Sequence, residues 1–238
     1  MKKIIGLILV GCFLGAHAND ELIKRLEERF PSAQVESMIE TNLLGLYEVV
    51  INGSVYYVDD GFTHLFDGSL IELSSMRNLT SERNAQIEEA ALKAVAIPFD
   101  QLPLDHAIKR VFGNGKRRFA YFADPNCGYC RKFDKEALGS VTDATLYIFL
   151  YPVITEKSIP ISKSIWCSDD RARAWDDYVL SGVMPTAPST CSNPIDDNLA
   201  FGKKMMVRAT PTLFFESGSR VSGALTVEQL EEQLNVTR

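Results

Sequence analysis

Residues 117–130 read Arg-Arg-Phe-Ala-Tyr-Phe-Ala-Asp-Pro-Asn-Cys-Gly-Tyr-Cys, and this stretch decides the fold of the second half of the chain. The aromatic and small apolar run at 118–122 predicts a buried strand. Residues 124–126 predict a turn, and a helix is expected from the Cys-x-x-Cys motif to about residue 138. The sequence therefore predicts a pair of cysteines between the end of a strand and the start of a helix.

The Cys-x-x-Cys motif in this position favours thiol–disulfide exchange. A helix N-terminus carries unpaired N–H groups and a partial positive charge, which stabilise a thiolate at Cys127. Because the thiolate is the nucleophile in this chemistry, Cys127 is the expected attacking group. Cys130 follows one helical turn later and is the expected resolving thiol, while Gly128 and Tyr129 are expected to tune the redox poise.

Three other interpretations of the motif compete with exchange. A zinc site needs a second pair of ligands, yet Cys167, Cys191, His64 and His106 are all distant in sequence. Covalent haem attachment needs a histidine directly after the motif, and that position is Arg131. A purely structural disulfide within the motif is a further alternative. We predict no metal and no cofactor beyond the redox-active disulfide of the motif itself.

The N-terminus predicts export from the cytoplasm. Lys2 and Lys3 precede an apolar run over residues 4–14, and Ala-His-Ala at 16–18 matches a cleavage site, so residues 1–18 are expected to be a cleaved signal peptide. The apolar run is about half the ~20 residues that a membrane-spanning helix needs. Residues 9–12 also resemble a bacterial lipobox, which would make Cys12 a lipidated N-terminus, but the residues after Cys12 stay apolar.

Cleavage would leave an even number of cysteines, and four cysteines allow three pairings. If the motif cysteines form one pair, Cys167 and Cys191 form the other, which we expect to be a structural disulfide. The alternative is a second redox pair that exchanges with the first.

The charge balance argues against nucleic acid as a partner. The chain has 25 basic and 31 acidic residues, and removal of Lys2 and Lys3 leaves 23 basic residues against the same 31. A net negative surface repels phosphate. The basic residues at 109–110 and 116–118 are expected to be a solvated edge beside a strand.

The first part of the mature chain predicts a small helix followed by an antiparallel sheet. Residues 20–30 alternate as an amphipathic helix, and Asn52-Gly53 between two β-rich runs is a strong hairpin signal. A domain of this size has a marginal core and is often stabilised by pairing with a copy of itself. Residues 81–97 predict a connecting helix that Pro98 ends.

The rest of the chain predicts an α/β fold of mixed sheet. A second apolar strand is expected over 145–151, mostly helices over 156–205, a strand over 211–215 and an amphipathic final helix. Thr210-Pro211 stands at the entrance of that late strand. A cis bond there would leave backbone groups of Thr210 free to pair with an extended substrate, although most X–Pro bonds are trans.

These motifs, taken together, resemble one known family. Residues 122–130, the Ile-Trp-Cys at 165–167, the Ala-Thr-Pro-Thr at 209–212 and the Tyr-Tyr-Val-Asp-Asp-Gly at 56–61 are similar to those of the DsbC protein disulfide isomerases of Gram-negative bacteria, in the DsbC/DsbG branch of the thioredoxin superfamily. The resemblance covers nearly the whole mature chain. Arg131 departs from the histidine found there in some relatives, which bears on the redox potential.

The resemblance implies an architecture. It implies an α+β N-terminal dimerisation module of cystatin-like type at 19–80, a linker helix at 81–112 and an α/β thioredoxin-like catalytic domain at 113–238 with a helical insert at about 155–205. It also implies a homodimer through residues 19–80, with two active sites that face an apolar cleft.

The resemblance further implies the site and its surroundings. Pro211 would be cis beside the motif cysteines, with Thr210 and Pro211 binding substrate, and Cys167–Cys191 would be the family's structural disulfide. The protein would be periplasmic, would act on misfolded disulfide-containing exported proteins and would be reduced by a membrane thiol reductase of the DsbD type.

Three functions are therefore weighed. The first is isomerisation, with reduction, of incorrect disulfides through Cys127 and Cys130. The second is a DsbG-like thiol reductase or a dithiol oxidase. The third belongs to another class, a periplasmic chaperone or assembly factor that holds unfolded clients. The N-terminal module favours the isomerase, because monomeric oxidases lack it.

Overall fold

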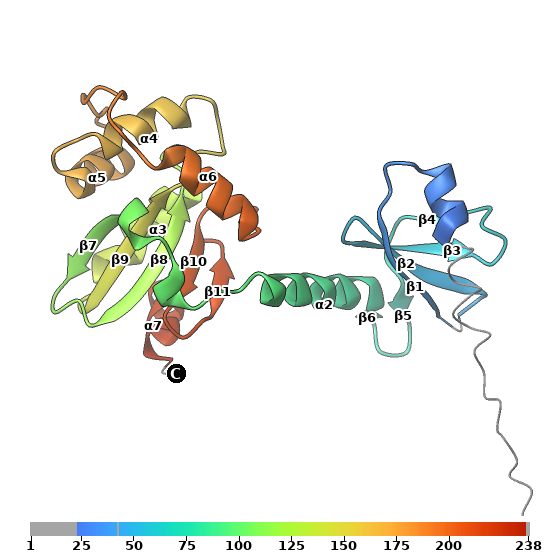
Figure 1. Cartoon of the computed structure of the whole chain (residues 1–238). Coiled ribbons are helices and arrows are strands. Elements are labelled where there is room, and N and C mark those ends of the chain that lie inside the picture. The colour runs from blue at the N-terminus through green and yellow to red at the C-terminus, as the bar shows by residue number, and fades with distance from the viewer. Residues whose placement is uncertain (1–22, 42, 237–238) are drawn as a thin grey trace, which may run out of the picture. The chain divides into compact units, whose positions relative to one another are not determined.

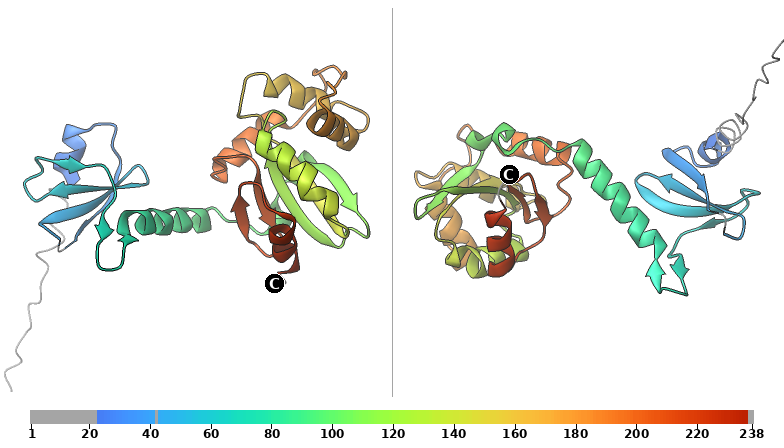
Figure 2. Two further views of the ribbon diagram at one scale, coloured as in Figure 1. Left: turned by 180° about the vertical axis from the view of Figure 1, so that it is seen from behind. Right: turned by 90° about the horizontal axis from the view of Figure 1, so that it is seen from below.

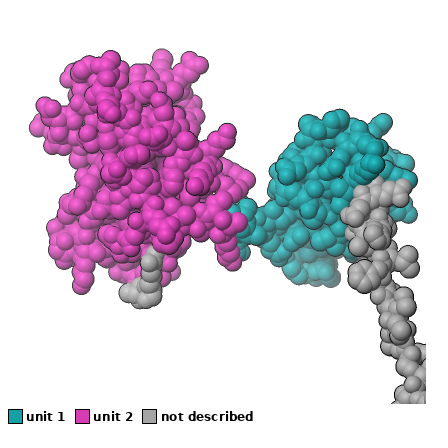
Figure 3. Space-filling view, in the orientation of Figure 1, with its two compact units in different colours: residues 1–91 teal, residues 92–238 magenta. Residues whose placement is uncertain are grey.

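The computed structural model describes residues 23–41 and 43–236, which divide into two compact units. Unit 1 is the part before residue 92 and unit 2 is the remainder (Figure 3). The predicted signal segment, with Cys12, lies outside the described residues. Over those residues, no helix is both long and apolar enough to cross a membrane.

Unit 1 contains a four-stranded antiparallel sheet in the order β1-β2-β3-β4 (Figure 1). Asn52 and Gly53 join β2 to β3 with φ of 49° and 77°, the left-handed conformation that a two-residue hairpin turn requires. Residues 23–29 are helical, and Leu26 belongs to the same small core as Met38. The strands are β1 (Val35–Glu40), β2 (Leu46–Ile51), β3 (Ser54–Asp59) and β4 (Leu65–Phe66).

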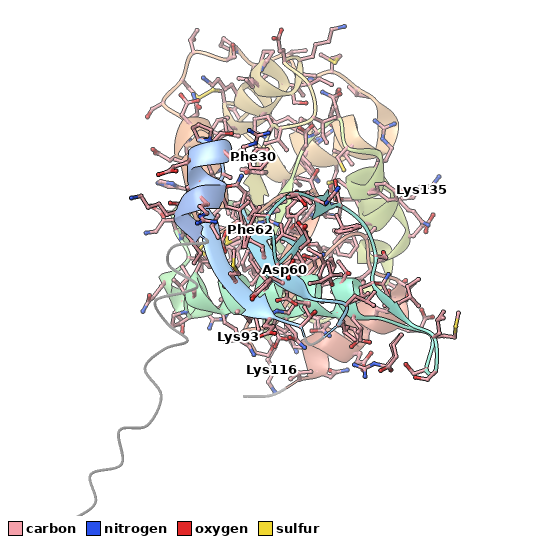
Figure 4. All side chains as sticks on the ribbon, turned by 90° about the vertical axis from the view of Figure 1, so that its right-hand side faces the viewer. Phe30, Asp60, Phe62, Lys93, Lys116 and Lys135 are labelled. Carbon is pink, nitrogen blue, oxygen red and sulfur yellow. A yellow bond between two sulfur atoms is a disulfide. The ribbon has the colours of Figure 1, made fainter. Side chains whose placement is uncertain are left out.

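Two further features complete unit 1. Phe62, labelled in Figure 4, follows β3 and packs beside Tyr47, with ring centroids 6.2 Å apart. A short hairpin of β5 (Ile71–Glu72) and β6 (Arg77–Asn78) leads directly into α2 (Leu79–Ala94).

The first turns of α2 are fastened to the sheet of unit 1. The hydroxyls of Tyr57 and Thr80 lie 2.7 Å apart, and the side chain of Asn84 accepts a hydrogen bond from the backbone of Val55 at 3.0 Å. The start of the linker helix is therefore part of the N-terminal unit.

Unit 2 is built on a five-stranded mixed sheet in the order β11-β10-β8-β9-β7 (Figures 1 and 2). The central strands β8 and β9 are parallel, and every other neighbouring pair is antiparallel. The strands are β7 (Ile108–Phe112), β8 (Arg117–Ala123), β9 (Ala144–Leu150), β10 (Thr212–Phe215) and β11 (Arg220–Ser222).

The buried strand β8 separates the core of unit 2 into two layers, because successive side chains point to opposite faces. Phe119 and Tyr121 face a layer covered by α3 (Gly128–Glu136), α5 (Arg171–Ser181) and α7 (Val227–Asn235). Phe122 faces the other layer, where it packs against Phe149 with ring centroids 4.8 Å apart. That second layer is closed by α6 (Ile195–Lys204) and by the short 3₁₀ turns η1 (Phe99–Gln101) and η2 (Leu104–His106).

The predicted helical insertion lies between β9 and β10. It consists of α4 (Ser158–Trp166), α5 and α6, and α4 and α5 form a lobe beyond one end of the sheet, at the top of Figure 1. A short η3 turn (Leu138–Ser140) joins α3 to β9. The expected fold class, a thioredoxin-like mixed sheet with a helical insertion that follows an antiparallel module and a linker helix, is confirmed.

One strand was not expected where the structure has it. The linker helix expected over 81–112 ends at Ala94, and residues 108–112 instead form β7, which pairs with β9 at the edge of the sheet. Lys109 interrupts the apolar pattern of this strand because its side chain faces solvent at the edge of the sheet, whereas Arg110 is largely buried and pairs with Asp134 and Asp176.

Candidate active site

The motif cysteines lie where β8 ends and α3 begins. Cys127 is the residue that caps α3, with φ of −79° and ψ of 116°, and its Sγ accepts a hydrogen bond from the backbone N–H of Cys130 at 3.3 Å. Both cysteines are free thiols. The sulfur of Cys127 thus satisfies one of the N–H groups that a helix start leaves unpaired, and it sits in the positive field of the helix.

The turn before Cys127 is held by the buried carboxylate of Asp124. It accepts hydrogen bonds from the backbone of Asn126 at 2.8 Å and from the hydroxyl of Ser158 at 2.7 Å. It also accepts from the backbone N–H groups of Val153 and Ile154, at 2.7 and 2.8 Å. Because four donors converge on one carboxylate, Asp124 fixes the strand-to-helix turn against the loop that leads into α4.

The surroundings of Cys127 favour its thiolate. Hydrogen bonds from the Cys130 thiol, and from the backbone N–H groups of Cys130 and Tyr129, lower the pKa of Cys127 to about 6 against the opposing effect of burial. In its protonated form the thiol donates a hydrogen bond to the carbonyl of Thr210 at 3.2 Å. With that pKa, Cys127 is mostly ionised at neutral pH, which gives the nucleophile that exchange needs.

Cys130 has the opposite environment. Its side chain is fully buried in the core among residues of β8 and α5, and burial raises the pKa of Cys130 well above that of an ordinary thiol. The hydrogen bond to Cys127 and the negative charge of its thiolate act in the same direction. Two cysteines three positions apart therefore differ sharply in acidity.

The Thr210–Pro211 peptide bond is cis, and it lies beside the motif. The hydrogen bond from Cys127 to the Thr210 carbonyl joins the start of α3 to the chain just before β10, 83 positions away in sequence. On the other side, the Pro211 carbonyl accepts the N–H of Gly223 at 2.8 Å. The structure thus brings Cys127, Cys130, Thr210 and Pro211 together.

The two residues between the cysteines face outward. Tyr129 is 69% exposed, and a Cβ placed on Gly128 would have no atom within 4 Å. Val153 and Ile154, on the loop that Asp124 holds, are 47% and 51% exposed. Exposed apolar side chains thus lie between the two cysteines in sequence and on the loop that is hydrogen-bonded to Asp124. The rest of α3 has a polar outer side, where Lys135 points to solvent (Figure 4).

The remaining two cysteines form a disulfide outside this group. Cys167 caps the end of α4 and is bonded to Cys191, which lies in the loop before α6, with the Cα atoms 5.8 Å apart. Ser158, at the start of α4, touches the active-site turn, and the nine residues of α4 extend about 13 Å from there. The disulfide thus fastens the insertion rather than the thiol pair.

Sequence reasoning missed three polar residues around the site. Asp124 holds the turn, while Asp134 and Tyr121 are buried behind Cys130 and hydrogen-bonded to each other. Two signals in the sequence point to the aspartates: Asp124 directly follows an apolar strand, and Asp134 lies four positions after Cys130. In the described part of the chain, no group of three or more metal-ligating side chains occurs.

Comparison with protein families divides the chain in the same way as its fold. A family model described as "Thioredoxin-like domain" matches residues 104–237. A second model, described as "Disulfide bond isomerase protein N-terminal domain", matches residues 15–81.

Curated relatives agree with this division. The "Probable thiol:disulfide interchange protein DsbC" of Bordetella pertussis is 39% identical over 215 residues, which is 90% of this chain and 74% of that protein. The "Thiol:disulfide interchange protein DsbC" of Escherichia coli K12 is 26% identical over 245 residues, 99% of this chain and 96% of that one. Among solved structures, a disulfide interchange protein from Neisseria gonorrhoeae is 38% identical with a TM-score of 0.52, over 55% of this chain and 94% of that one.

Proposed function

Since this chain belongs to the DsbC family of thiol:disulfide interchange proteins, we propose that Cys127 and Cys130 isomerise, and also reduce, incorrect disulfides in exported proteins. The observation that carries the proposal is the contrast in acidity between the two thiols. Cys127 has a pKa of about 6 at a helix start, whereas Cys130 is buried and protonated. Cys127 is therefore ionised and able to attack a disulfide, whereas Cys130 stays protonated until a mixed disulfide has formed.

In the first step, the Cys127 thiolate attacks one sulfur of a wrong client disulfide. A bond forms between Cys127 and that sulfur, and the second client sulfur leaves as a thiolate. In isomerisation, another client thiolate then attacks the mixed disulfide, forms a new client disulfide and returns Cys127 as a thiolate. No net electrons pass between client and enzyme.

In the reductive branch, Cys130 attacks Cys127 instead. The Cys127–Cys130 disulfide forms, the client sulfur leaves as a thiolate and the client gains two electrons. A membrane thiol reductase of the DsbD type would return the pair to the dithiol form. This branch frees the enzyme when a client offers no correct partner thiol.

We assign client binding to the cis segment of Thr210 and Pro211. The Thr210 carbonyl accepts a hydrogen bond from Cys127 only while that thiol is protonated. When Cys127 is ionised or joined to a client, no thiol proton occupies this carbonyl, and the backbone of Thr210 can pair with the extended client chain beside the mixed disulfide. The exposed side chains of Tyr129, Val153 and Ile154 offer apolar contacts to the same chain.

The N-terminal unit is assigned to homodimer formation. Its strand β4 pairs with β3 on one side only, and Leu65 and Phe66 of that edge strand are 40% and 52% exposed. An open apolar edge in a unit with a small core is stabilised by pairing with a second copy. Phe66→Asp is expected to shift sedimentation at micromolar concentration from dimer to monomer. Leu44→Asp, at a 95% exposed loop position outside the sheet, is the matched control.

The cellular compartment is inferred from the predicted signal peptide and from the structural disulfide. Residues 1–18 have the pattern of a cleaved signal peptide, and a structural disulfide persists in an oxidising compartment. We therefore assign the protein to the periplasm, where misfolded disulfide-containing proteins are its clients.

The proposal is tested with a scrambled multi-disulfide protein and a catalytic amount of the reduced enzyme. Recovery of native client is expected from the wild type and none from Cys127→Ala. Cys130→Ala is expected to accumulate client adducts through Cys127. If Cys127→Ala traps clients as well as Cys130→Ala does, the assignment of roles is wrong. Oxidation of reduced clients without recovery of scrambled ones would favour an oxidase, and suppressed aggregation without either cysteine would favour a chaperone.

A further inference from the structure

Thr210 and Pro211 lie at the end of a segment that has no regular secondary structure. The segment runs from residue 205, where α6 has ended, to residue 211, just before β10. Backbone N–H and C=O groups that no helix or strand pairs must find other partners, and a segment whose groups are paired is held in one conformation. The groups that pair with this segment therefore decide where the Thr210 backbone lies.

Arg220, from β11, binds the first two carbonyls of the segment. Its Nη1 and Nη2 groups donate hydrogen bonds to the carbonyls of Met205 and Met206, at 2.5 and 2.7 Å. The guanidinium also lies over the ring of Phe214, 5.1 Å from its centroid. Carbonyls at a helix C-terminus carry a partial negative charge, and the planar guanidinium can donate to two acceptors at once. Arg220 therefore joins the end of α6 to the edge strand of the sheet.

Met206 has a backbone conformation that needs such support. Its φ is 53°, in the left-handed region that residues with a side chain rarely adopt. A conformation of this kind persists only where the surrounding contacts determine it. Here the Met206 N–H donates a hydrogen bond to the Lys203 carbonyl at 3.0 Å, and its own carbonyl accepts from Arg220. The unfavourable conformation is thus held at both polar groups of the residue.

Tyr151, which directly follows β9, binds the next carbonyl. Its hydroxyl donates a hydrogen bond to the carbonyl of Val207 at 3.1 Å, and burial raises the pKa of Tyr151, so the hydroxyl keeps the proton that it donates. A Cβ placed on Gly202 would lie 2.4 Å from the Tyr151 ring, so α6 can approach the ring only because it has a glycine there. The ring of Phe122 packs 5.5 Å away at 90°. These contacts fix the ring that carries the donor.

The carbonyls on both sides of Thr210 are also bound by groups of unit 2. The Ala209 carbonyl accepts a hydrogen bond from the Thr212 hydroxyl at 2.7 Å. The Pro211 carbonyl accepts a backbone N–H from the loop after β11 at 2.8 Å. Between them, the Thr210 carbonyl lies 3.2 Å from the sulfur of Cys127. The fold thus pairs the neighbouring carbonyls with its own donors and directs the Thr210 carbonyl to the active site.

We propose that Arg220 and Tyr151 are positioning residues for client binding. They hold the carbonyls of residues 205–207 and thereby keep the Thr210 backbone in place for an extended client chain. This inference rests on the proposed binding of clients by Thr210. A bound client would donate a backbone N–H to the Thr210 carbonyl, as a strand added to a sheet edge does. A fixed acceptor binds more tightly than a mobile one, because less conformational freedom is lost on binding.

The test compares two symmetrical disulfides as targets of Cys127, in the full-length protein with Cys130→Ala so that the reaction stops at the mixed disulfide. One target is the disulfide dimer of an extended peptide with a single cysteine. The other is hydroxyethyl disulfide, which has no peptide backbone. The small disulfide measures the reactivity of the thiolate alone. The ratio of the two second-order rates, peptide over small disulfide, therefore isolates the contribution of the client chain.

The variants are expected to lower this ratio. Arg220→Met should lower it about tenfold and Tyr151→Phe about threefold, because each loosens the segment that presents the Thr210 carbonyl. The loss should lie in the apparent affinity for the peptide, measured from the concentration dependence, and not in the maximal rate. Arg220→Lys keeps the charge but cannot donate to both carbonyls in the same geometry, so its ratio should fall between those of the wild type and Arg220→Met.

Arg118→Met is the matched control. Arg118 also lies over a phenylalanine ring of unit 2, 5.3 Å from the centroid of Phe99. It pairs with the carboxylates of Glu216 and Asp100 and not with the carbonyls of the segment. Its replacement is expected to keep the ratio within about twofold of the wild type, since it removes a comparable surface arginine from a different place.

A modified peptide tests the client bond itself. N-methylation of the residues that flank its cysteine removes the backbone N–H groups that could pair with Thr210. In the wild type this should lower the ratio about tenfold. With the methylated peptide, Arg220→Met should lower the ratio little further, because both changes weaken the same bond.

The outcomes separate the two proposals. If N-methylation lowers the wild-type ratio but Arg220→Met and Tyr151→Phe leave it unchanged, the positioning role is refuted and client binding by Thr210 stands. The same holds if both rates fall in parallel, or if Arg118→Met lowers the ratio as much as Arg220→Met does, because a general loss of structure then explains the effect. If N-methylation leaves the wild-type ratio unchanged, the binding role of Thr210 is itself wrong, and the positioning role is refuted with it.

Discussion

The two cysteine pairs of this chain have identical side chains but lie in different structural environments. Cys127 and Cys130 are free thiols three positions apart at the start of α3, surrounded by helix N–H groups and by a buried carboxyl. Cys167 and Cys191 are 24 positions apart and form a disulfide that joins the end of α4 to a loop. One pair lies where a thiolate is stabilised, and the other closes a loop of the insertion.

This difference shows that local structure, more than residue type, decides what a cysteine does. At the thiol pair, the fold holds a thiolate and an ionised carboxylate in a largely buried place, which costs stability and makes the site reactive. At the disulfide, the fold restricts the unfolded chain and gains stability. Changes at the first pair should therefore alter chemistry, and changes at the second should alter stability.

The largest expected effect is the loss of exchange in Cys127→Ser. Without the low-pKa sulfur, the rate of attack on a small disulfide should fall at least about 1,000-fold, which corresponds to about 4 kcal/mol of activation free energy. The unfolding midpoint should change little. The rate is measured by the formation of mixed disulfide with oxidised glutathione. Residual attack within tenfold of the wild type would mean that another thiol carries the reaction.

The next largest effect concerns the second cysteine pair, whose loss should lower stability but leave exchange nearly unchanged. Simultaneous replacement of Cys167 and Cys191 by alanine should lower the free energy of unfolding by about 3–4 kcal/mol, because the closed loop no longer restricts the unfolded chain. The rate of attack by Cys127 should stay within about threefold, since the disulfide fastens the far end of α4. Denaturant unfolding and the glutathione assay measure the two quantities. A loss of exchange without a loss of stability would point to a second redox pair.

The smallest effect concerns the stability cost of the reactive site. The pKa of Asp134 is raised from 3.8 to about 6 on folding, so the folded state binds that proton more tightly than the unfolded state. Its contribution to stability is present below about pH 4 and is lost as pH rises through 6, by about 2–3 kcal/mol.

Asp134→Asn removes this titration. Over the range from about pH 4 to pH 7, its free energy of unfolding should fall by about 2–3 kcal/mol less than that of the wild type. Denaturant unfolding at several pH values gives both curves, with Asp105→Asn as the control because that side chain is 85% exposed. Parallel curves for the wild type and Asp134→Asn would show that ionisation of the buried carboxyl does not lower the free energy of unfolding.

Local patterns predicted the elements around the thiol pair, because each follows from neighbouring residues. The strand before Cys127, the helix after it, the Asn52-Gly53 hairpin and the final helix all have such patterns. The resemblance to the DsbC family added the order of the domains, and the family comparisons confirm an N-terminal domain of the disulfide isomerase type followed by a thioredoxin-like domain.

The parts that could not be predicted depend on contacts between distant residues. Arg110 makes β7 look like a solvated segment, but its charge is balanced by Asp134 and Asp176, 24 and 66 positions later. Asp124 looks like an ordinary turn residue until the loop at 153–154 is placed against it. In both cases a charge is explained only by groups that the fold brings from elsewhere.

The most direct test of the account is the acidity of each motif thiol. The reduced protein is exposed briefly to iodoacetamide at a series of pH values, and mass spectrometry of the peptides gives the modified fraction of each cysteine. We expect modification of Cys127 to rise with a midpoint at about pH 6 and Cys130 to stay unmodified over the whole range. Equal reactivity of the two thiols, or a midpoint for Cys127 near the ordinary thiol value of about 8.5, would contradict the account.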